Sequence, residues 1–397
     1  MSEVFRPQRL KFGIFMAPFH RVGENPTLAL ERDIELVEYL EKLDYDEVWF
    51  GEHHSAGWEI IASPEVMIAA AGQRTKRIKL GTGVSSLPYH HPFMLADRMS
   101  QLDHLTRGRA MLGVGPGALT SDAYQMGIDP LTQRRRMDES LGAIMRLLEG
   151  ETVTMETDWF TMRDARLQLA PYALPHLDVA AASSFSPAGP TATGKYGIGM
   201  LSVTSSQPGG MTNAAASWKL AEDAAAKHGQ TISRANWRLL ISMHLAEDAA
   251  QARRDIEEGC HHFYTEYFGN TLGSPIGKDF SVQSMIDSGG LVVGTPDEAI
   301  AAVERIFELT GGFGTLLFNT HEWTTWDKTL KSMELWARYV APRFQGQLGA
   351  IQANQQWVAG NRATIFAPAQ AAIGKAFADA GIEIPAEAVA RMNRGRS

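Results

Sequence analysis

The sequence predicts an α/β fold, a (β/α)8 TIM barrel with insertions and a C-terminal helical extension. Eight short apolar runs recur along the chain, helical patterns separate them in strict alternation, and most runs end in glycine or small polar residues. Near-continuous apolar runs are typical of parallel strands that are covered on both faces. The predicted strands are Leu10–Met16, Glu47–Gly51, Ile78–Ser85, Ala110–Gly115, Leu177–Ser183, Gly199–Val203, Trp237–Ala246 and Thr315–Asn319.

The segments between these strands begin with helix-capping residues. Asn25 and Ser63 each precede a proline, so that a polar cap is followed by proline at the first helical position. Thr295 is followed by a proline and two acids, which suit the positive end of a helix. The predicted helices therefore begin in the loops that follow the strands.

Two segments, Gly150–Pro175 and Gly269–Val293, are longer than the connections of a minimal barrel. The second is rich in glycine and serine, and we expect it to form a lid over the active site. Residues 1–343 are predicted to form the barrel. Residues 344–397 read as helical pieces rich in alanine and glutamine, and we expect a packing or dimer arm rather than an independent domain.

The composition argues against several classes of protein. With 44% hydrophobic and 21% charged residues, the chain has the composition of a globular protein. A net charge of −8 without a basic cluster argues against nucleic-acid binding. No stretch approaches the ~18 apolar residues of a membrane span, and the N-terminus has no apolar signal core. Cys260 is the single cysteine, so no internal disulfide can form, and we expect a reducing cytoplasm.

Gly51 ends the second predicted strand and is followed by Glu52, His53 and His54. The active site of a (β/α)8 barrel lies at the C-terminal ends of its strands, and an acid beside imidazoles there suits general acid–base work and hydrogen-bond donation. Adjacent residues at a strand end point to different sides, so at most one of these histidines should face the centre of the barrel mouth. A structural histidine is the alternative interpretation.

Further histidines leave open a metal site. His20, His90 and His91 could converge with Glu52 and the His53–His54 pair on a divalent ion. None of these histidines has the His-x-His spacing of barrel metallohydrolases, so no metal is predicted.

Two segments rich in glycine and serine, each at the end of a predicted strand, could bind a cofactor. Gly81–Ser86 matches neither the dinucleotide nor the P-loop fingerprint, but its glycines would let a flat ligand approach the backbone. A tight turn is the alternative. Ser183–Gly189 follows the fifth strand, and hydroxyls with free backbone N–H groups at a helix start can hold an anion. We expect Ser186 to be the cap residue and Pro187 the first helical residue, and an ordinary helix cap is the alternative.

Apolar and aromatic side chains near the strand ends suit a hydrophobic substrate and a large planar cofactor, although such residues are also common in plain cores. The residues expected to line the mouth or contact substrate are Met16, Pro18, Phe19, His20, Trp58, Tyr89, His91 and Met94.

With these motifs in place, the chain resembles the bacterial luciferase-like flavin monooxygenase family over roughly residues 10–344. Within that family, Phe12–Thr27 and Ser55–Glu59 look most like the flavin-dependent limonene monooxygenases. The stretches that match the family in order and spacing are Gly51–His54, Leu80–Pro88, Leu102–Arg109, Ser186–Pro187, Val293–Glu298 and Met333–Pro342.

The resemblance implies a two-component monooxygenase that uses reduced FMN and O2 to oxygenate a small hydrophobic substrate. We expect epoxidation of limonene or a related monoterpene. A separate reductase would supply the reduced flavin from NAD(P)H, FAD is an alternative to FMN, and a homodimer is expected. The alternatives are a Baeyer–Villiger or aldehyde monooxygenase of the same family, a hydride-transfer oxidoreductase that uses a deazaflavin, and a flavin-binding barrel without catalysis.

The resemblance also implies roles for individual residues. His53 would steady the activated oxygen, with Glu52 as its acidic neighbour and His54 beside it. A cis peptide bond is expected at Gly83–Val84, with the flavin ring against it. The implied cofactor-binding residues are Gly83, Val84, Ser85, Gly115, Ser184 and Ser186.

This chain departs from luciferase near the expected phosphate site. Luciferase has an arginine, a glutamate and a threonine where this chain has Pro116, Phe185 and Gly189. Phosphate binding would therefore use other groups, such as Ser184 and backbone N–H donors.

Overall fold

A computed structural model describes residues 4–17, 19–203, 209–274, 281–287, 289–320, 322–386 and 389. The chain divides into two compact units, Met1–Gln345 and Gly346–Ser397. The first unit contains the barrel, and the second contains helices α13 (Gly349–Gly360) and α14 (Arg362–Asp379). The role of the C-terminal extension as a packing or dimer arm stays a prediction.

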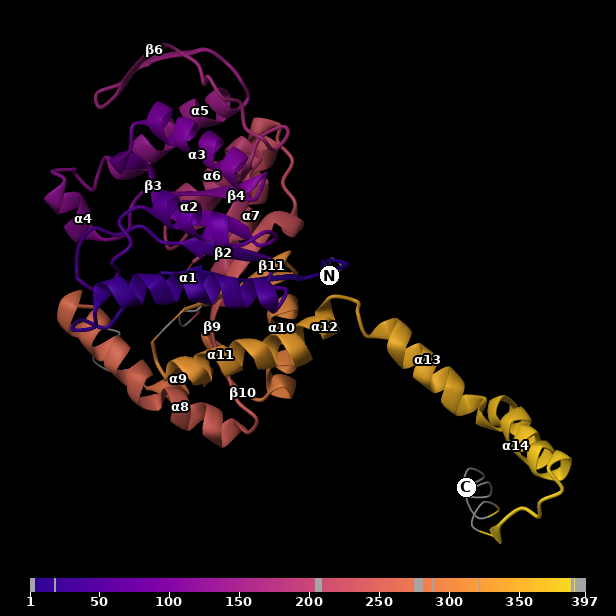
Figure 1. Ribbon diagram of the computed structural model, residues 1–397. Coiled ribbons are helices and arrows are strands. Elements are labelled where there is room, and N and C mark those ends of the chain that lie inside the picture. Colours follow the sequence, from indigo (N-terminus) through magenta and orange to yellow (C-terminus); the bar gives the residue numbers. More distant parts are fainter. Residues whose placement is uncertain are drawn as a thin grey trace. The chain divides into compact units, whose positions relative to one another are not determined.

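Eight parallel strands of the described residues close into a barrel (Figure 1). β1 pairs with β2 and with β11, and the ring continues through β3, β4, β7, β8 and β9 back to β11. The eight predicted strands are confirmed, with each end within one residue of its prediction. They are β1 (Lys11–Met16), β2 (Glu47–Phe50), β3 (Lys79–Ser86), β4 (Ala110–Gly115), β7 (Asp178–Ser183), β8 (Gly199–Ser202), β9 (Trp237–Leu245) and β11 (Thr315–Asn319).

Three short strands were not predicted. β5 (Val153–Glu156) and β6 (Thr161–Ala165) form an antiparallel hairpin within the first insertion. The hairpin lies beside α5, at the top of Figure 1, where Trp159 donates to a Glu139 carboxylate oxygen at 2.8 Å. β10 (Leu291–Gly294) pairs with the second half of β9. It finds an open edge because β11 pairs only with the first half of that long strand.

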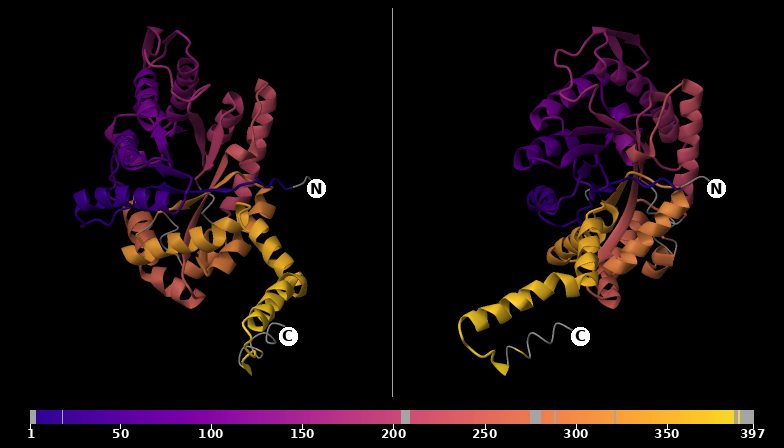
Figure 2. Two further views of the ribbon diagram at one scale, coloured as in Figure 1. Left: turned by 45° about the vertical axis from the view of Figure 1, so that its right-hand side comes forward. Right: turned by 90° about the vertical axis from the view of Figure 1, so that its right-hand side faces the viewer.

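Helices follow the barrel strands and surround them (Figures 1 and 2). The predicted caps at Asn25 and Thr295 are confirmed: the Asn25 side chain accepts two backbone N–H groups, and Thr295 forms a capping box with Glu298. Ser63 precedes its helix as predicted but makes no capping bond. The helices of this unit are α1 (Pro26–Lys42), α2 (Pro64–Arg74), α3 (Pro92–Thr106), α4 (Thr120–Gln125), α5 (Gln133–Leu148), α6 (Ala188–Tyr196), α7 (Gly210–His228), α8 (Ala249–His262), α9 (Val282–Asp287), α10 (Pro296–Thr310), α11 (Trp326–Leu335) and α12 (Ala341–Phe344), with 3-10 turns at Leu87–Tyr89 and Arg234–Asn236 and π-helical segments at Phe263–Thr271 and Trp336–Val340.

The second insertion is partly built into this fold. After the π-helical segment Phe263–Thr271, the chain forms α9 and then β10. Residues 275–280 and 288 of the predicted lid lie outside the described residues, so its role stays a prediction.

The barrel interior is filled by side chains from alternate positions of the strands. A β-carbon at Gly81 would meet the ring of Trp49 at 2.5 Å, and one at Gly83 would meet Trp49 at 2.9 Å. These glycines therefore make room for a tryptophan inside the barrel, and both lie within strand β3, so the alternative of a tight turn at these glycines is wrong. The interior cluster consists of Phe15, Trp49, Met111, Ala180, Leu201, Leu240 and Leu317.

A buried ion-pair network closes the N-terminal end of the barrel. Arg238 donates from Nε to Glu47 at 2.7 Å and from an Nη nitrogen to Asp178 at 2.6 Å, and it lies over the ring of Trp49. Burial raises the pKa of Asp178, but Arg238 outweighs this effect, and the pKa is lower than its ordinary value. The network fixes strands β2, β7 and β9 to one another at the end opposite the expected active site.

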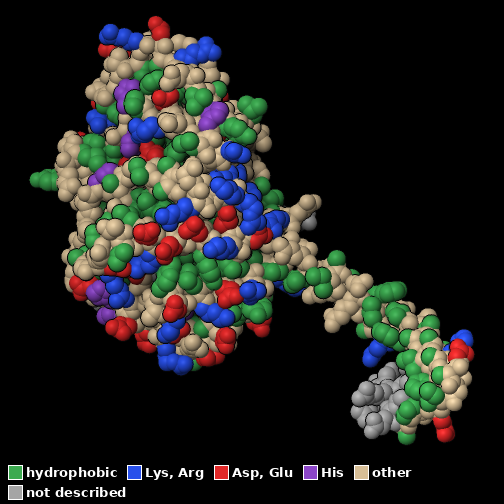
Figure 3. Space-filling view, viewed as in Figure 1, with side chains coloured by type: hydrophobic (Ala, Val, Ile, Leu, Met, Phe, Trp, Pro, Cys, Tyr) green, Lys and Arg blue, Asp and Glu red, His purple; other side chains and the backbone are tan. Residues whose placement is uncertain are grey.

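Acidic and basic side chains lie beside one another on the barrel face shown in Figure 3. Within the described part of the chain, no helix is long and apolar enough to cross a membrane.

Candidate active site

Glu52 is the hub of one hydrogen-bond network at the C-terminal end of the barrel, the barrel mouth. Its carboxylate is 2% exposed and receives the backbone N–H of Ser86 at 2.6 Å. The Nε2 atoms of His54 and His90 lie 3.1 and 2.7 Å from its other oxygen. Burial raises the pKa of Glu52, but these hydrogen bonds outweigh it and hold the pKa below its ordinary value. Glu52 is therefore an anion that positions two imidazoles.

His53 stands between two other carboxylates. Its Nδ1 lies 3.1 Å from Asp122, and its Nε2 lies 3.0 Å from Glu59. Burial alone would lower the pKa of His53, but Glu59 and then Asp122 raise it to about 10. At neutral pH the ring is therefore an imidazolium with an N–H at both nitrogens.

The two predicted histidines thus have different partners, as their alternating directions require. His54 joins Glu52, and the pKa of His54 is raised mainly by that hydrogen bond. Its ring meets Tyr89 edge-on, with ring centres 6.0 Å apart. Tyr89 accepts a hydrogen bond from Gln133, and burial raises its pKa to about 12. The structure brings Glu52, His53, His54 and Tyr89 close together, and their catalytic and substrate roles stay predictions.

The end of β3 combines a cis peptide bond, a close backbone approach and a buried hydroxyl. The Gly83–Val84 peptide bond is cis, which confirms that expectation. A β-carbon at Gly115 would meet Val84 at 2.6 Å, so glycine there leaves room for the valine. Ser85 is completely buried, and its hydroxyl has no hydrogen-bond partner among the described residues. An unpartnered hydroxyl beside a close backbone approach fits a polar, planar cofactor.

The expected phosphate side differs from the prediction in one respect. α6 begins at Ala188 with Pro187 as its N-cap residue and no capping side chain, so the prediction that Ser186 caps this helix is wrong. The chain still bends before the helix, which leaves Ser184 and Ser186 half-buried. A β-carbon at Gly189 would lie 1.9 Å from the carbonyl oxygen of Ala182, so the tight contact between α6 and β7 excludes a threonine there.

Several predicted substrate contacts lie elsewhere. Met16 does not line the mouth: it packs in the main core, while the preceding Phe15 belongs to the barrel interior. The reason is that successive side chains of a strand point to opposite faces. His91 and Met94 are exposed, and His91 meets the ring of Phe160 near the hairpin. Pro18 lies outside the described residues.

Phe19 and Trp58 belong to an aromatic cluster beside His53. Phe19 lies 4.5 Å from Phe263 and 5.4 Å from Tyr267, measured between ring centres, and Trp58 lies 5.6 Å from Tyr267. These two predicted substrate residues therefore share one apolar wall with the π-helical segment Phe263–Thr271.

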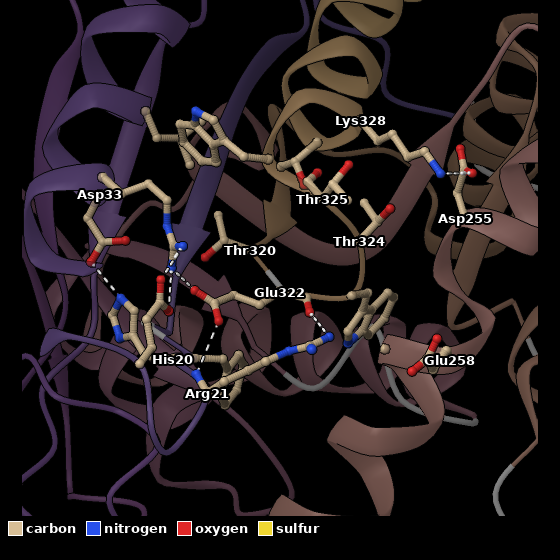
Figure 4. A pocket seen from close by; sticks show the side chains of 18 of the residues that line it. His20, Arg21, Asp33, Asp255, Glu258, Thr320, Glu322, Thr324, Thr325 and Lys328 are labelled. Atoms are coloured by element: carbon tan, nitrogen blue, oxygen red, sulfur yellow. Dashed lines mark hydrogen bonds and ion pairs between the residues drawn. The ribbon is translucent and has the colours of Figure 1, made fainter. Parts of the chain in front are cut away.

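His20 lies apart from the other histidines. Its Nε2 is 3.1 Å from Asp33 on α1, at the edge of a cavity of about 850 Å³ between α1, α8 and the loop after β11 (Figure 4). Neither Glu52 nor His53 is among the described residues that line this cavity. Many of its charges are paired with one another, as Lys328 is with Asp255 at 2.7 Å.

A metal site at the mouth does not form from these histidines. Each histidine there pairs with a carboxylate, and His20 pairs with a different one at a distance from them. Among the residues that the structure describes, no three histidine, cysteine or acidic side chains are grouped as ligands for a metal ion.

Three residues of this site were missed in the sequence. Asp122 lies in the segment after β4, at the active end of the barrel, and that position was the available signal. Glu59 follows His53 by six residues and gives no pattern of its own. Tyr267, whose hydroxyl donates to Glu59, lies 208 residues further along the chain.

Comparison with known proteins agrees with this geometry. The family model described as luciferase-like monooxygenase matches residues 10–312. Limonene 1,2-monooxygenase from Rhodococcus erythropolis is 48% identical over 343 residues, which make up 86% of this chain and 88% of that protein. 4-Hydroxyprotoasukamycin monooxygenase from Streptomyces nodosus subsp. asukaensis is 48% identical over 360 residues, 89% of this chain and 97% of that protein.

A solved structure shows the same fold. It is the oxygenating constituent of 3,6-diketocamphane monooxygenase from Pseudomonas putida, a type II Baeyer–Villiger monooxygenase in complex with FMN. It has a TM-score of 0.72 and 24% identity, and the match covers 84% of this chain and 99% of that one. The barrel and the reaction class expected from the sequence are confirmed, and the chain belongs to the luciferase-like monooxygenase family.

Proposed function

We propose that this monooxygenase is the oxygenase component of a two-component system and uses reduced FMN and O2 to epoxidise a small cyclic alkene of the limonene type. The observation that carries the proposal is His53, held between Asp122 and Glu59 at the barrel mouth. A reduced flavin, when bound, supplies the chemistry that activates O2 and transfers one oxygen atom.

The charge of His53 favours epoxidation over attack on a carbonyl. With a pKa of about 10, the ring carries a proton on each nitrogen at neutral pH, and both N–H groups face carboxylates. The oxidant would receive a hydrogen bond from His53 in place of one of these carboxylates. An oxidant that accepts such a bond is electrophilic and suits an alkene, whereas a ketone or an aldehyde requires a nucleophilic one.

The residues present fit both ligands. Gly83, Val84, Ser85 and Gly115 would hold the flavin ring, because they combine a close backbone approach with a free buried hydroxyl. The hydroxyls of Ser184 and Ser186, together with backbone N–H groups before α6, would hold the phosphate.

The substrate side is apolar and suits a hydrocarbon. Phe19 and Trp58 would form its wall, with Tyr89 beside His54, and such a wall excludes water from the reaction. The predicted contact of Pro18 with substrate is a further part of the proposal.

The related enzymes support a hydrophobic substrate but do not identify which compound it is. The limonene and 4-hydroxyprotoasukamycin enzymes are equally identical to this chain, so identity does not separate their substrates. The FMN in the related barrel supports FMN over FAD. A separate NAD(P)H-dependent flavin reductase, a homodimer and a cytoplasmic location are further parts of the proposal. The buried free thiol of Cys260 suits a reducing compartment.

Reconstitution tests the proposal. The protein would be mixed with FMN, NAD(P)H, a flavin reductase and ¹⁸O₂, and offered limonene and, separately, a bicyclic ketone. We expect an epoxide that carries one labelled oxygen atom, and no product when the oxygenase is omitted. A labelled lactone from the ketone without any epoxide would replace the proposal by Baeyer–Villiger chemistry. Oxygen-independent turnover with a deazaflavin would replace it by hydride transfer.

A further inference from the structure

Glu59 bridges two elements that are distant in sequence. One of its carboxylate oxygens lies 3.0 Å from Nε2 of His53, and the other accepts a hydrogen bond from the hydroxyl of Tyr267. Glu59 also forms an isolated antiparallel bridge with Phe19, which fixes its backbone against the loop after β1. The carboxylate therefore has defined partners on both sides.

The bridge is shielded from water. Glu59 is 5% exposed and Tyr267 is 2% exposed. Tyr267 lies on the π-helical segment Phe263–Thr271 and packs against Trp58 and Phe19. Charges in such surroundings interact more strongly than charges at the surface, because solvent screens them less. π-Helical turns within helices also occur frequently at functional sites.

The groups that face His53 come from several elements. Asp122 approaches Nδ1 from α4, Glu59 approaches Nε2 from the loop after β2, and His54 follows His53 in the chain. Tyr267 reaches His53 only through Glu59. Both ring nitrogens of His53 thus have a carboxylate partner, and one of these carboxylates depends on the π-helical segment.

We propose that Glu59 is a positioning residue that keeps His53 oriented and protonated, and that Tyr267 anchors Glu59 for this purpose. The inference rests on the proposed function only in taking His53 as the catalytic histidine. The Tyr267 hydroxyl holds one Glu59 oxygen while the other faces Nε2 of His53. Without that hydroxyl the carboxylate can turn away from Nε2, which weakens the charge that faces His53 without any change in His53 itself.

The test is a titration of His53 in the flavin-free protein. The histidine rings would be labelled with ¹³C and followed by NMR from pH 6 to about pH 11, so that the midpoint of the unaltered protein is reached, with the His53 signal assigned from a His53→Gln variant. In the unaltered protein His53 should stay protonated through pH 9. In Glu59→Gln its midpoint should fall by about 1–3 pH units, the usual effect of an opposite charge nearby.

Tyr267→Phe should lower the midpoint in the same direction but by less. The double variant should match Glu59→Gln within about 0.3 pH units, because the effect of Tyr267 passes through Glu59. Tyr45→Phe is the matched control: Tyr45 is also a buried tyrosine, and its hydroxyl donates to the backbone of Met333 in the main core. It should leave the midpoint unchanged.

Two results would overturn the inference. If His53 titrates at the same pH in Glu59→Gln and in the unaltered protein, Glu59 does not hold its proton. If Tyr267→Phe behaves like Tyr45→Phe, Tyr267 only packs. Neither result depends on substrate. A clear midpoint shift without epoxide formation in the reconstituted system would therefore reject the proposed function and leave this inference standing.

Discussion

Replacement of Arg238 by methionine should destabilise the barrel by roughly 3–5 kcal/mol, the usual cost of removing one partner of a buried ion pair. Methionine fills a similar volume, but Glu47, which is 1% exposed, then loses its countercharge. Among the described residues, the indole N–H of Trp49 at 2.8 Å and the hydroxyl of Thr315 at 3.2 Å still donate to it. The variant also loses the cation–π contact of the guanidinium with the Trp49 ring, so we expect a loss of stability toward the upper end of this range.

Equilibrium unfolding in guanidinium chloride, followed by tryptophan fluorescence, would measure this loss. The double variant Arg238→Met, Glu47→Gln should recover most of it, because the fully buried carboxylate left without a partner is removed, whereas the Asp178 side chain is 26% exposed and remains in contact with water. Flavin binding to the folded variants should be unchanged, since the network lies at the opposite end of the barrel from His53. A loss below about 1 kcal/mol, or a double variant less stable than the single one, would refute the reasoning.

Three further predictions concern the active site. His53→Ala should keep flavin binding but lower the product formed per O2 by at least about tenfold, measured as product against H2O2, and an unchanged ratio would reject its catalytic role. Ser186→Ala should weaken binding of FMN more than of riboflavin in a fluorescence titration, and equal losses would place Ser186 away from the phosphate. The pKa of Glu52 is lower in the folded protein than its ordinary value of 4.5. Its contribution to stability is therefore fully present above pH 4.5 and is lost as the pH falls through the lowered pKa of the folded state. Glu52→Gln should therefore melt at a lower temperature than the unaltered protein at pH 7, and this difference should shrink toward pH 3. A difference that stays constant with pH would show that the Glu52 charge does not stabilise the fold.

The barrel could be predicted because its strands carry a local signal. Strands that are covered on both faces are continuously apolar, and the glycines and polar residues after them mark the active end. The same rule missed β5 and β6, which are short and half-exposed, and β10, which is four residues long and only extends β9.

The direction of side chains at strand ends was a second feature that the sequence could not predict. Met16 and Phe15 are neighbours of similar character, and only the register of β1 decides that Phe15 faces inward. Ser186 is a residue type that often caps helices, but α6 begins two residues later, at Ala188. The next residue, Gly189, lets the helix backbone approach β7. Both outcomes depend on backbone placement to within one or two residues.

The sequence by itself determined the barrel strands and the position of the histidine pair after β2, and its family resemblance implied the cis bond that lies within β3. Only the tertiary structure decided which groups face His53. Asp122 lies 69 residues away from it, and Tyr267 lies 208 residues from Glu59. The charge of a buried imidazole depends on the carboxylates that the fold brings to it, and these come from elements whose sequences carry no shared pattern.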